Sequence, residues 1–199
     1  MAIILELNMI CVRPFDINIL QSITDYDLNF SIDNVSCIDN WMWENQTELK
    51  DNADIERYLN NKKIIVINLK SFKFNDMGIY IEKINDEYIY NIWINTEGYP
   101  ELDSDVLNPN NFDFFKKLYN ILSQILREQN IQYKILAIGT EILFFYDKDI
   151  NSIFMKSKNV ISWIINRELV GTFNSKEILK KEYKEKEIYG LNAIVFEKY

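Results

Sequence analysis

The chain has 199 residues, of which 48% are hydrophobic and 14% aromatic, a net charge of −8 and no histidine. This length fits one domain with a sizeable core, and the hydrophobic content is too high for a disordered chain. The absence of histidine excludes Ser-His-Asp and Cys-His nucleophilic sites and removes the commonest transition-metal ligand.

The sequence gives no sign of a membrane segment or a secretion signal. No apolar run reaches the roughly 18–20 residues that span a bilayer, and the apolar N-terminus has no basic region before it. Cys11 and Cys37 have neither CxxC spacing nor further cysteines to pair with. We therefore expect a cytoplasmic protein with reduced thiols, no cofactor, no metal and no membrane contact.

The first third of the chain predicts a strand followed by a helix. Residues 3–10 alternate between apolar side chains and a polar side that carries Glu6 and Asn8, which is typical of a half-buried strand. Pro14 opens a predicted helix that ends at about Asp25. Residues 30–46 have no clear periodicity, so they predict neither a strand nor a helix.

The middle of the chain predicts a helix, a buried strand and a hairpin. Residues 47–61 read as a helix with Thr47 as its N-cap, and the β-branched run 64–69 reads as a central strand. Residues 78–95 alternate on both sides of an Asn85-Asp86 turn, as in a β-hairpin. On the return strand, one face carries tyrosines and isoleucines, and the other carries Ile89, Asn91 and Trp93.

The rest of the chain begins with the strongest helical pattern, at about 111–129, where apolar residues recur every three or four positions. Two short strands at 132–138 and 141–146 and a helical region with one interruption at 149–168 come next. A charged helix that begins at Ser175 and ends at about residue 186, and a final strand at 188–199, complete the chain. Strands and helices mix without strict alternation. We predict a single α+β domain over 1–199, with a mostly antiparallel sheet packed against the long amphipathic helix 111–129.

Acidic residues concentrate in the first part of the chain. Residues 1–61 hold 11 acids and 3 bases, and residues 25–56 hold nine acids and one lysine. An acidic surface repels phosphate backbones, so direct nucleic-acid binding is not expected, whereas a basic protein would be attracted. Trp41-Met42-Trp43 lies in the middle of this segment, and such residues are enriched at interfaces. The alternative is that one or both tryptophans are core residues, because large aromatic side chains are mostly buried.

A second acidic segment, WINTEGYPELDSD at 93–105, holds four carboxylates. Its DxD does not continue as an EF-hand, because Leu107, Asn108 and Phe114 occupy positions that need ligands or glycine. A magnesium site at Asp103 and Asp105 remains open. We predict a solvated loop before the helix, where negative charge is favourable, and we expect it to form a second edge of a docking surface.

Other chemistry has weaker support. Glu48-Leu-Lys50 and Glu182-Tyr-Lys184 have the E-x-K spacing of a nuclease core, but both fall on predicted helices. Glu141 is a carboxylate in an apolar run and would be an acid/base candidate if it pointed inward, although a turn position facing solvent is expected. Neither GxGxxG nor GxxxxGK[ST] occurs, so nucleotide binding through such loops is not predicted.

In size, acidity and composition the chain resembles the immunity proteins of bacterial polymorphic-toxin systems. This resemblance implies a non-catalytic binding protein whose acidic face neutralises a basic partner, a cognate toxin. We expect the partner-binding residues to be Asp33, Asp39, Trp41, Trp43, Glu44, Glu48, Asp51, Glu97, Tyr99, Glu101, Asp103 and Asp105. Two alternatives remain: a metal-dependent enzyme working through Asp103, Asp105 and Glu141, and a phage or host accessory protein whose acidic surface mimics nucleic acid.

Overall fold

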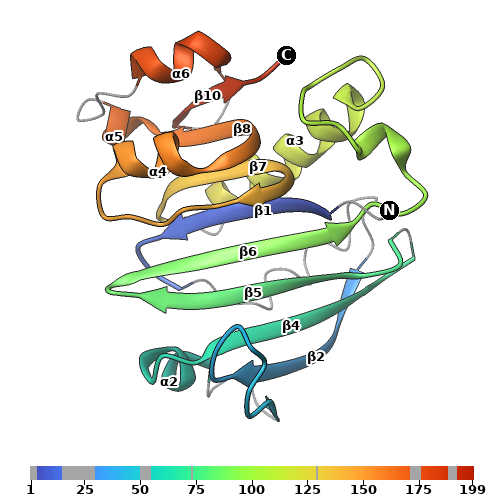
Figure 1. Cartoon of the computed structure of the whole chain (residues 1–199), viewed down its shortest axis with the longest axis vertical. Helices are drawn as coiled ribbons and strands as arrows, with labels where there is room; N and C mark the ends of the chain where they lie inside the picture. The colour runs from blue at the N-terminus through green and yellow to red at the C-terminus, as the bar shows by residue number, and fades with distance from the viewer. Residues whose placement is uncertain are drawn as a thin grey trace.

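A computed structural model describes residues 4–14, 30–49, 55–72, 74–128, 130–170, 176–187 and 192–199. Within these residues, ten strands form one antiparallel sheet in the order β3-β2-β4-β5-β6-β1-β7-β8-β10-β9 (Figure 1). Ile4–Cys11 (β1) lies near the middle, between β6 and β7. The first described strand therefore joins the two halves of the sheet.

The strands of one half are β2 (Phe30–Ile38), β3 (Thr47–Glu48), β4 (Ile64–Ser71), β5 (Met77–Ile84) and β6 (Glu87–Asn95). The other half contains β7 (Tyr133–Leu143), β8 (Lys158–Asn166), β9 (Lys184–Glu187) and β10 (Ala193–Glu197). Both edges of the sheet are poor templates for further pairing: β3 has two residues, and all four residues of β9 are charged and exposed.

Helices lie on both faces of the sheet (Figure 1). On one face, α3 (Phe112–Glu128) and α2 (Ile55–Asn60) contribute Phe115, Leu118 and Leu59 to a large apolar core over β1, β4, β5 and β6. On the opposite face, α4 (Ile150–Lys156) and α6 (Lys176–Glu182) pack over β7, β8 and β10. The short helices η3 and α5 span Pro100–Leu102 and Arg167–Val170. No helix among the described residues is long and apolar enough to cross a bilayer.

The prediction of a mostly antiparallel sheet is confirmed, but the balance between sheet and helix was wrong. The sheet is the main element of the fold, and it is not packed against one long helix alone. Helices from several parts of the chain share the two faces, because β1 brings two sheet halves together and each exposes an apolar surface that must be buried.

Several local predictions need correction. Residues 30–38 form β2, and 47–48 form the edge strand β3 instead of a helix capped by Thr47. The segment predicted as two strands at 132–146 is one strand, β7, with register shifts near Gly139. The helix predicted at 14–25 and residue Asp51 lie outside the described residues.

The C-terminal part also differs from its prediction. The region read as helical at 149–168 divides into α4 and the buried strand β8, and the charged segment read as one helix ends as the edge strand β9. Apolar runs such as Val160–Ile165 fit a buried strand as well as a buried helix by periodicity alone. Pairing with β7 and β10 decides for the strand.

Candidate functional site

One face of the central strands is polar, and we call this surface the polar strip. It lies on β1, β2, β4, β5 and β6, opposite α3, and the strand register aligns it in two rows. The first row contains Asn34, Asn68, Gly78, Trp93 and Glu6, and the second contains Ser36, Val66, Tyr80, Asn91 and Asn8. Most members of the two rows are polar or aromatic, whereas Val66 of the second row belongs to a buried apolar cluster with Ile38 and Ile64.

Amide side chains link the strands of the polar strip. Asn91 donates from Nδ2 to Glu6 Oε1 and to Asn8 Oδ1, both at 2.9 Å, and Asn68 donates to Asn34 at 2.9 Å. Asn8 is only 3% exposed, yet its Nδ2 has no hydrogen-bond partner among the described residues, and neither has Asn91 Oδ1. A buried polar group without a partner costs about 1–3 kcal/mol, so these groups are not explained by stability.

Four aromatic side chains continue across the polar strip. Tyr80 stacks on Trp93 with ring centroids 6.1 Å apart, and Trp41 and Trp43 meet Tyr80 edge-on at 5.3 and 6.3 Å. Gly78 makes room for the indole of Trp93, because a Cβ there would lie 2.8 Å from Trp93 Cζ2. The aromatic row therefore depends on one glycine in β5.

The two tryptophans of this row that precede β3 belong to the loop 39–46, which we call the Trp loop. Hydrogen bonds within the loop fix its shape: Asp39 N donates to Glu44 O at 3.0 Å, and Asn40 Nδ2 donates to Glu44 Oε2 at 2.7 Å. Trp43 has a backbone φ of 60°, a left-handed conformation that is uncommon for a bulky residue. The loop holds Trp41 51%, Met42 81% and Trp43 45% exposed.

A cleft of about 290 Å³ opens beside the Trp loop, and we call it the strip cleft. Asn8 and Asn91 line it from the sheet, Trp41 and Tyr80 from the aromatic row, and Glu82 from β5. Its remaining wall comes from apolar residues and from the segment after β7, namely Ile84, Ile89, Ile142, Phe144 and Tyr146. No lysine or arginine lies among the described residues that line it.

The carboxylates of the polar strip are partly desolvated. Burial raises the pKa of Glu82 above its ordinary value, and a hydrogen bond from Trp41 partly offsets this. Burial also raises the pKa of Glu6, against the opposing effect of Asn91, and the nearby charge of Glu141 adds to the increase. Both groups therefore gain from contact with a positive charge.

The strip cleft ends at Tyr146, whose position is fixed by a carboxylate. Its hydroxyl donates to Glu87 Oε2 at 2.7 Å, and Glu87 also pairs with Lys134. Burial and the hydrogen bond to Glu87 raise the pKa of Tyr146 to about 12, so the phenol stays protonated at neutral pH.

The described part of the first acidic segment includes the Trp loop, although two of its carboxylates are neutralised. Asp39 pairs with Lys63, which holds the pKa of Asp39 below its ordinary value, and Asp33 pairs with Lys70. Glu44 and Glu48 are exposed. Among the predicted partner-binding residues that the structure describes, Trp41 alone lines the strip cleft. Trp41 and Trp43 are both exposed, so the hypothesis that they are core residues is wrong.

The second predicted acidic segment lies at the opposite end of the strands. The second segment begins at the end of β6, where the backbone N–H of Asn95 donates to Asp76 O at the start of β5. The Trp loop follows β2, whose last residues pair with the start of β4. The start of β4 in turn lies beside the other end of β5. The eight residues of β5 span roughly 25 Å. The structure therefore does not bring the two acidic segments together as edges of one surface.

The residues of the second segment mainly make local contacts. Tyr99 packs on Phe74 with ring centroids 5.1 Å apart, and Asp103 accepts a hydrogen bond from Thr96 Oγ1 at 2.6 Å. Asp105 pairs with Lys198 at 3.7 Å, while Glu97 and Glu101 are exposed. Each of these contacts explains its residue without a metal or a partner.

Glu141 is exposed at a bulge of β7, with a φ of 47°, as expected for a turn residue that faces solvent. Within the described parts of the chain, no group of three or more Cys, Asp or Glu side chains has the proximity needed to hold a metal ion. The structure therefore does not gather Asp103, Asp105 and Glu141, the carboxylates of the alternative metal-dependent enzyme, into one metal site.

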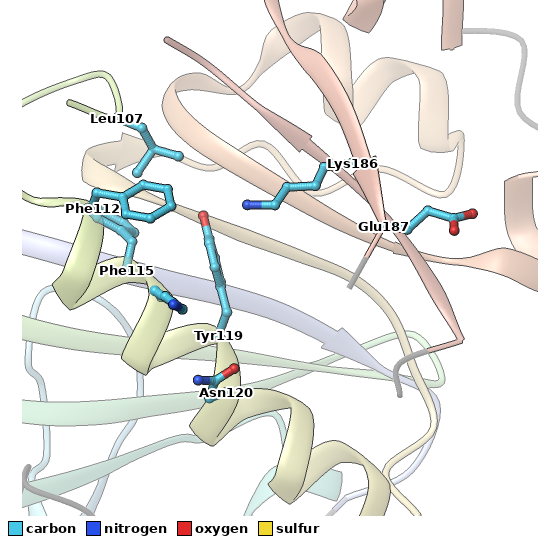
Figure 2. Close-up of a pocket in the computed structure, with 8 residues that line it drawn as sticks. Leu107, Phe112, Phe115, Tyr119, Asn120, Lys186 and Glu187 are labelled. Carbon is cyan, nitrogen blue, oxygen red and sulfur yellow. The ribbon is translucent and has the colours of Figure 1, made fainter. Parts of the chain in front are cut away.

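A second cavity, of about 200 Å³, lies on the other face between α3 and β9. Figure 2 shows Tyr119 and Lys186 pointing toward one another across it, with Leu107 and Phe112 at one end and Glu187 turned away. Lys186 Nζ lies 3.4 Å from Glu197 Oε2 and 5.6 Å from the centre of the Phe112 ring. The ammonium group of Lys186 is thus already paired.

Beneath this cavity a carboxylate is buried in the sheet. Glu197 of β10 is 1% exposed and pairs in register with Ser162, and its Oε2 accepts a hydrogen bond from Tyr199 at 2.7 Å. Tyr119 of α3 lies near Ser162 and Glu197, and its own burial raises its pKa. This cluster joins α3 to β8 and β10, although Tyr119 Oη, Ser162 Oγ and Glu197 Oε1 have no hydrogen-bond partner among the described residues.

The sequence matches no protein-family model, and comparisons with curated proteins and with solved structures also find no match. The candidate site therefore stands on geometry alone. Sequence reasoning missed Tyr80, Glu82 and Asn91 as site residues. The alternation placed Glu6 and Asn8 on one side of their strand, and it placed Asn91 and Trp93 on one side of theirs. The missing information was that these strands are neighbours.

Proposed function

We propose that this chain is a non-catalytic binding protein that neutralises a basic protein partner, in the manner of a toxin-neutralising immunity protein. The observation that carries the proposal is the Trp loop, which holds Trp41, Met42 and Trp43 between 45% and 81% exposed on a backbone fixed by its own hydrogen bonds. A rigid aromatic anchor loses little conformational entropy on binding, and tryptophan is enriched among the residues that dominate interface energies.

Charge supports a basic partner. The chain has a net charge of −8, to which the exposed carboxylates Glu44 of the Trp loop and Glu48 of β3 contribute. The uncompensated Glu82 lies beside Trp41. Apolar anchors surrounded by negative charge favour a protein with a basic surface, and the field accelerates the encounter. Nothing observed among the described residues favours the metal-dependent enzyme or the nucleic-acid mimic over this function.

Affinity capture with a matched pair of variants tests the proposal. Immobilised wild-type protein should retain a basic protein from the native organism, and the double variant Met42→Asp with Trp43→Ala should lose it. The control is Phe72→Ala, which removes a fully exposed aromatic residue outside the Trp loop. For the purified pair, we expect the double variant to weaken binding by about 30-fold or more and the control to leave it unchanged.

Two outcomes would reject this function. One is a captured partner whose affinity is the same for the Trp-loop variant and for wild type. The other is capture of nucleic acid or of acidic proteins alone, since neither fits the charge of this surface.

A further inference from the structure

We propose that the strip cleft receives the side chain of an arginine from the partner protein. This inference rests on the proposed function and names the chemical group that the site recognises. The Trp loop would contact the surface around that arginine, while the guanidinium enters beside Trp41 and Tyr80.

The chemistry of the cleft walls supports a planar cation. Trp41, Tyr80, Phe144 and Tyr146 supply aromatic surface, on which guanidinium groups stack more readily than ammonium groups. Glu82 supplies a carboxylate that is partly buried and that no lysine or arginine among the lining residues neutralises. A ligand carboxylate or phosphate would instead meet Glu82 without a counter-charge.

The floor of the cleft adds a second, independent observation. Asn91 retains a carbonyl oxygen, Oδ1, that has no hydrogen-bond partner among the described residues. Arginine has five N–H donors and no acceptor, so the Asn91 carbonyl and the Glu82 carboxylate are the acceptors it requires. A volume of about 290 Å³ accommodates one side chain rather than a peptide segment.

The position of Trp41 connects the cleft to the proposed interface. Its indole donates a hydrogen bond to Glu82, its ring contacts Tyr80, and half of its surface remains exposed. A guanidinium that binds Glu82 must therefore change the surroundings of the Trp41 indole N–H. This makes that proton a direct reporter of occupancy.

The test is an NMR titration of the full chain with N-acetyl-arginine amide. The indole N–H signal of Trp41, assigned through Trp41→Phe, should shift in a saturable way. N-acetyl-citrulline amide has nearly the same shape without the charge, and should bind at least tenfold more weakly. N-acetyl-lysine amide should fall between the two. Equal binding of the arginine and citrulline probes would overturn the proposal, as would tighter binding of the lysine probe or no shift at Trp41.

A variant pair locates the binding. Glu82→Gln keeps an acceptor for Trp41 but removes the charge, so it should weaken arginine-amide binding at least tenfold while the thermal midpoint stays close to that of wild type. Glu182→Gln removes an exposed carboxylate on α6 and should leave binding unchanged. Equal affinity in the Glu82 variant would place the arginine elsewhere and overturn the assignment.

Failure of this inference is distinguishable from failure of the proposed function. If a basic partner depends on Met42 and Trp43 but the arginine probe does not bind, the function stands and the cleft assignment falls. If the probe binds through Glu82 but no basic protein is retained by the Trp loop, the cleft binds a cation and the proposed function falls.

Discussion

The two faces of the central strands differ in a way that separates stability from recognition. The face beneath α3 is a closed apolar core in which Leu5, Ile67 and Ile79 are at most 1% exposed. The opposite face of the same strands carries amides, carboxylates and aromatic rings, with polar atoms left unpartnered. Since a sheet can be stabilised through one face, the second face is free to carry a binding site.

The largest difference between the faces should appear when an apolar anchor of the covered face is truncated. Phe115 of α3 is 1% exposed, so Phe115→Ala removes a fully buried ring and leaves a cavity. We expect the free energy of unfolding to fall by about 3–5 kcal/mol, measured by urea denaturation. A loss below about 1 kcal/mol would mean that α3 is not part of the cooperative core.

A smaller loss of stability is expected from a substitution at Gly78. Gly78→Ala would place a Cβ 2.7 Å from Ile67 O and 2.8 Å from Trp93 Cζ2, and the backbone oxygen cannot easily move. We expect a loss of about 1–3 kcal/mol with a change in tryptophan fluorescence. In a double-mutant cycle, Trp93→Val should recover part of that loss, and strict additivity would show that Trp93 does not pack on Gly78.

In the polar strip, by contrast, we expect a substitution at Glu6 to increase the stability of the fold at neutral pH. Burial raises the pKa of Glu6, so the folded state holds this proton more tightly than the unfolded state does. The resulting stabilisation is complete below the unfolded pKa of about 4.3, and it is lost as pH rises through the higher folded pKa. Near pH 7 the ionised carboxylate of Glu6 therefore lowers the free energy of unfolding, and Glu6→Gln removes this effect.

We expect Glu6→Gln to be more stable than wild type at pH 7, and the difference to disappear near pH 4, in urea denaturation at both pH values. Glu82, Asp39 and other shifted carboxylates titrate equally in both proteins and cancel in the comparison. A variant that is less stable at pH 7 would show that Glu6 serves the fold and not the polar strip.

The smallest effect on stability is expected in the Trp loop. Met42 is 81% exposed, so Met42→Ala should change the free energy of unfolding by no more than about 0.5 kcal/mol. The same substitution should weaken binding to the captured partner. If Met42→Ala instead destabilised the chain by more than about 1 kcal/mol, the loop would be a structural element and the division between the two faces would not hold.

Local sequence patterns predicted the elements whose signal lies within one segment. Strand β1 and the hairpin β5–β6 were found from alternation and from the Asn85-Asp86 turn. The β-branched run of β4 was also found. In each case, neighbouring residues alone specify the alternation that a half-buried strand requires.

Other elements depend on partners far away in the sequence. Strand β2 has no clear periodicity by itself and forms by pairing with β4, and β8 becomes a strand between β7 and β10. The charged segment 184–187 has helix-compatible ion-pair spacing, yet it pairs with β10 at the sheet edge. Tertiary pairing overrides weak local preference in all three.

The sequence by itself determined the acidic character of the chain, the absence of histidine chemistry, the polar sides of β1 and β6, and the aromatic pair of the Trp loop. Only the tertiary structure decided that β1 lies beside β6, which places Asn8, Asn91 and Tyr80 in one row and creates the strip cleft. The physical reason is that alternation assigns a residue to one side of its own strand, whereas a binding site requires several strands to present those sides together.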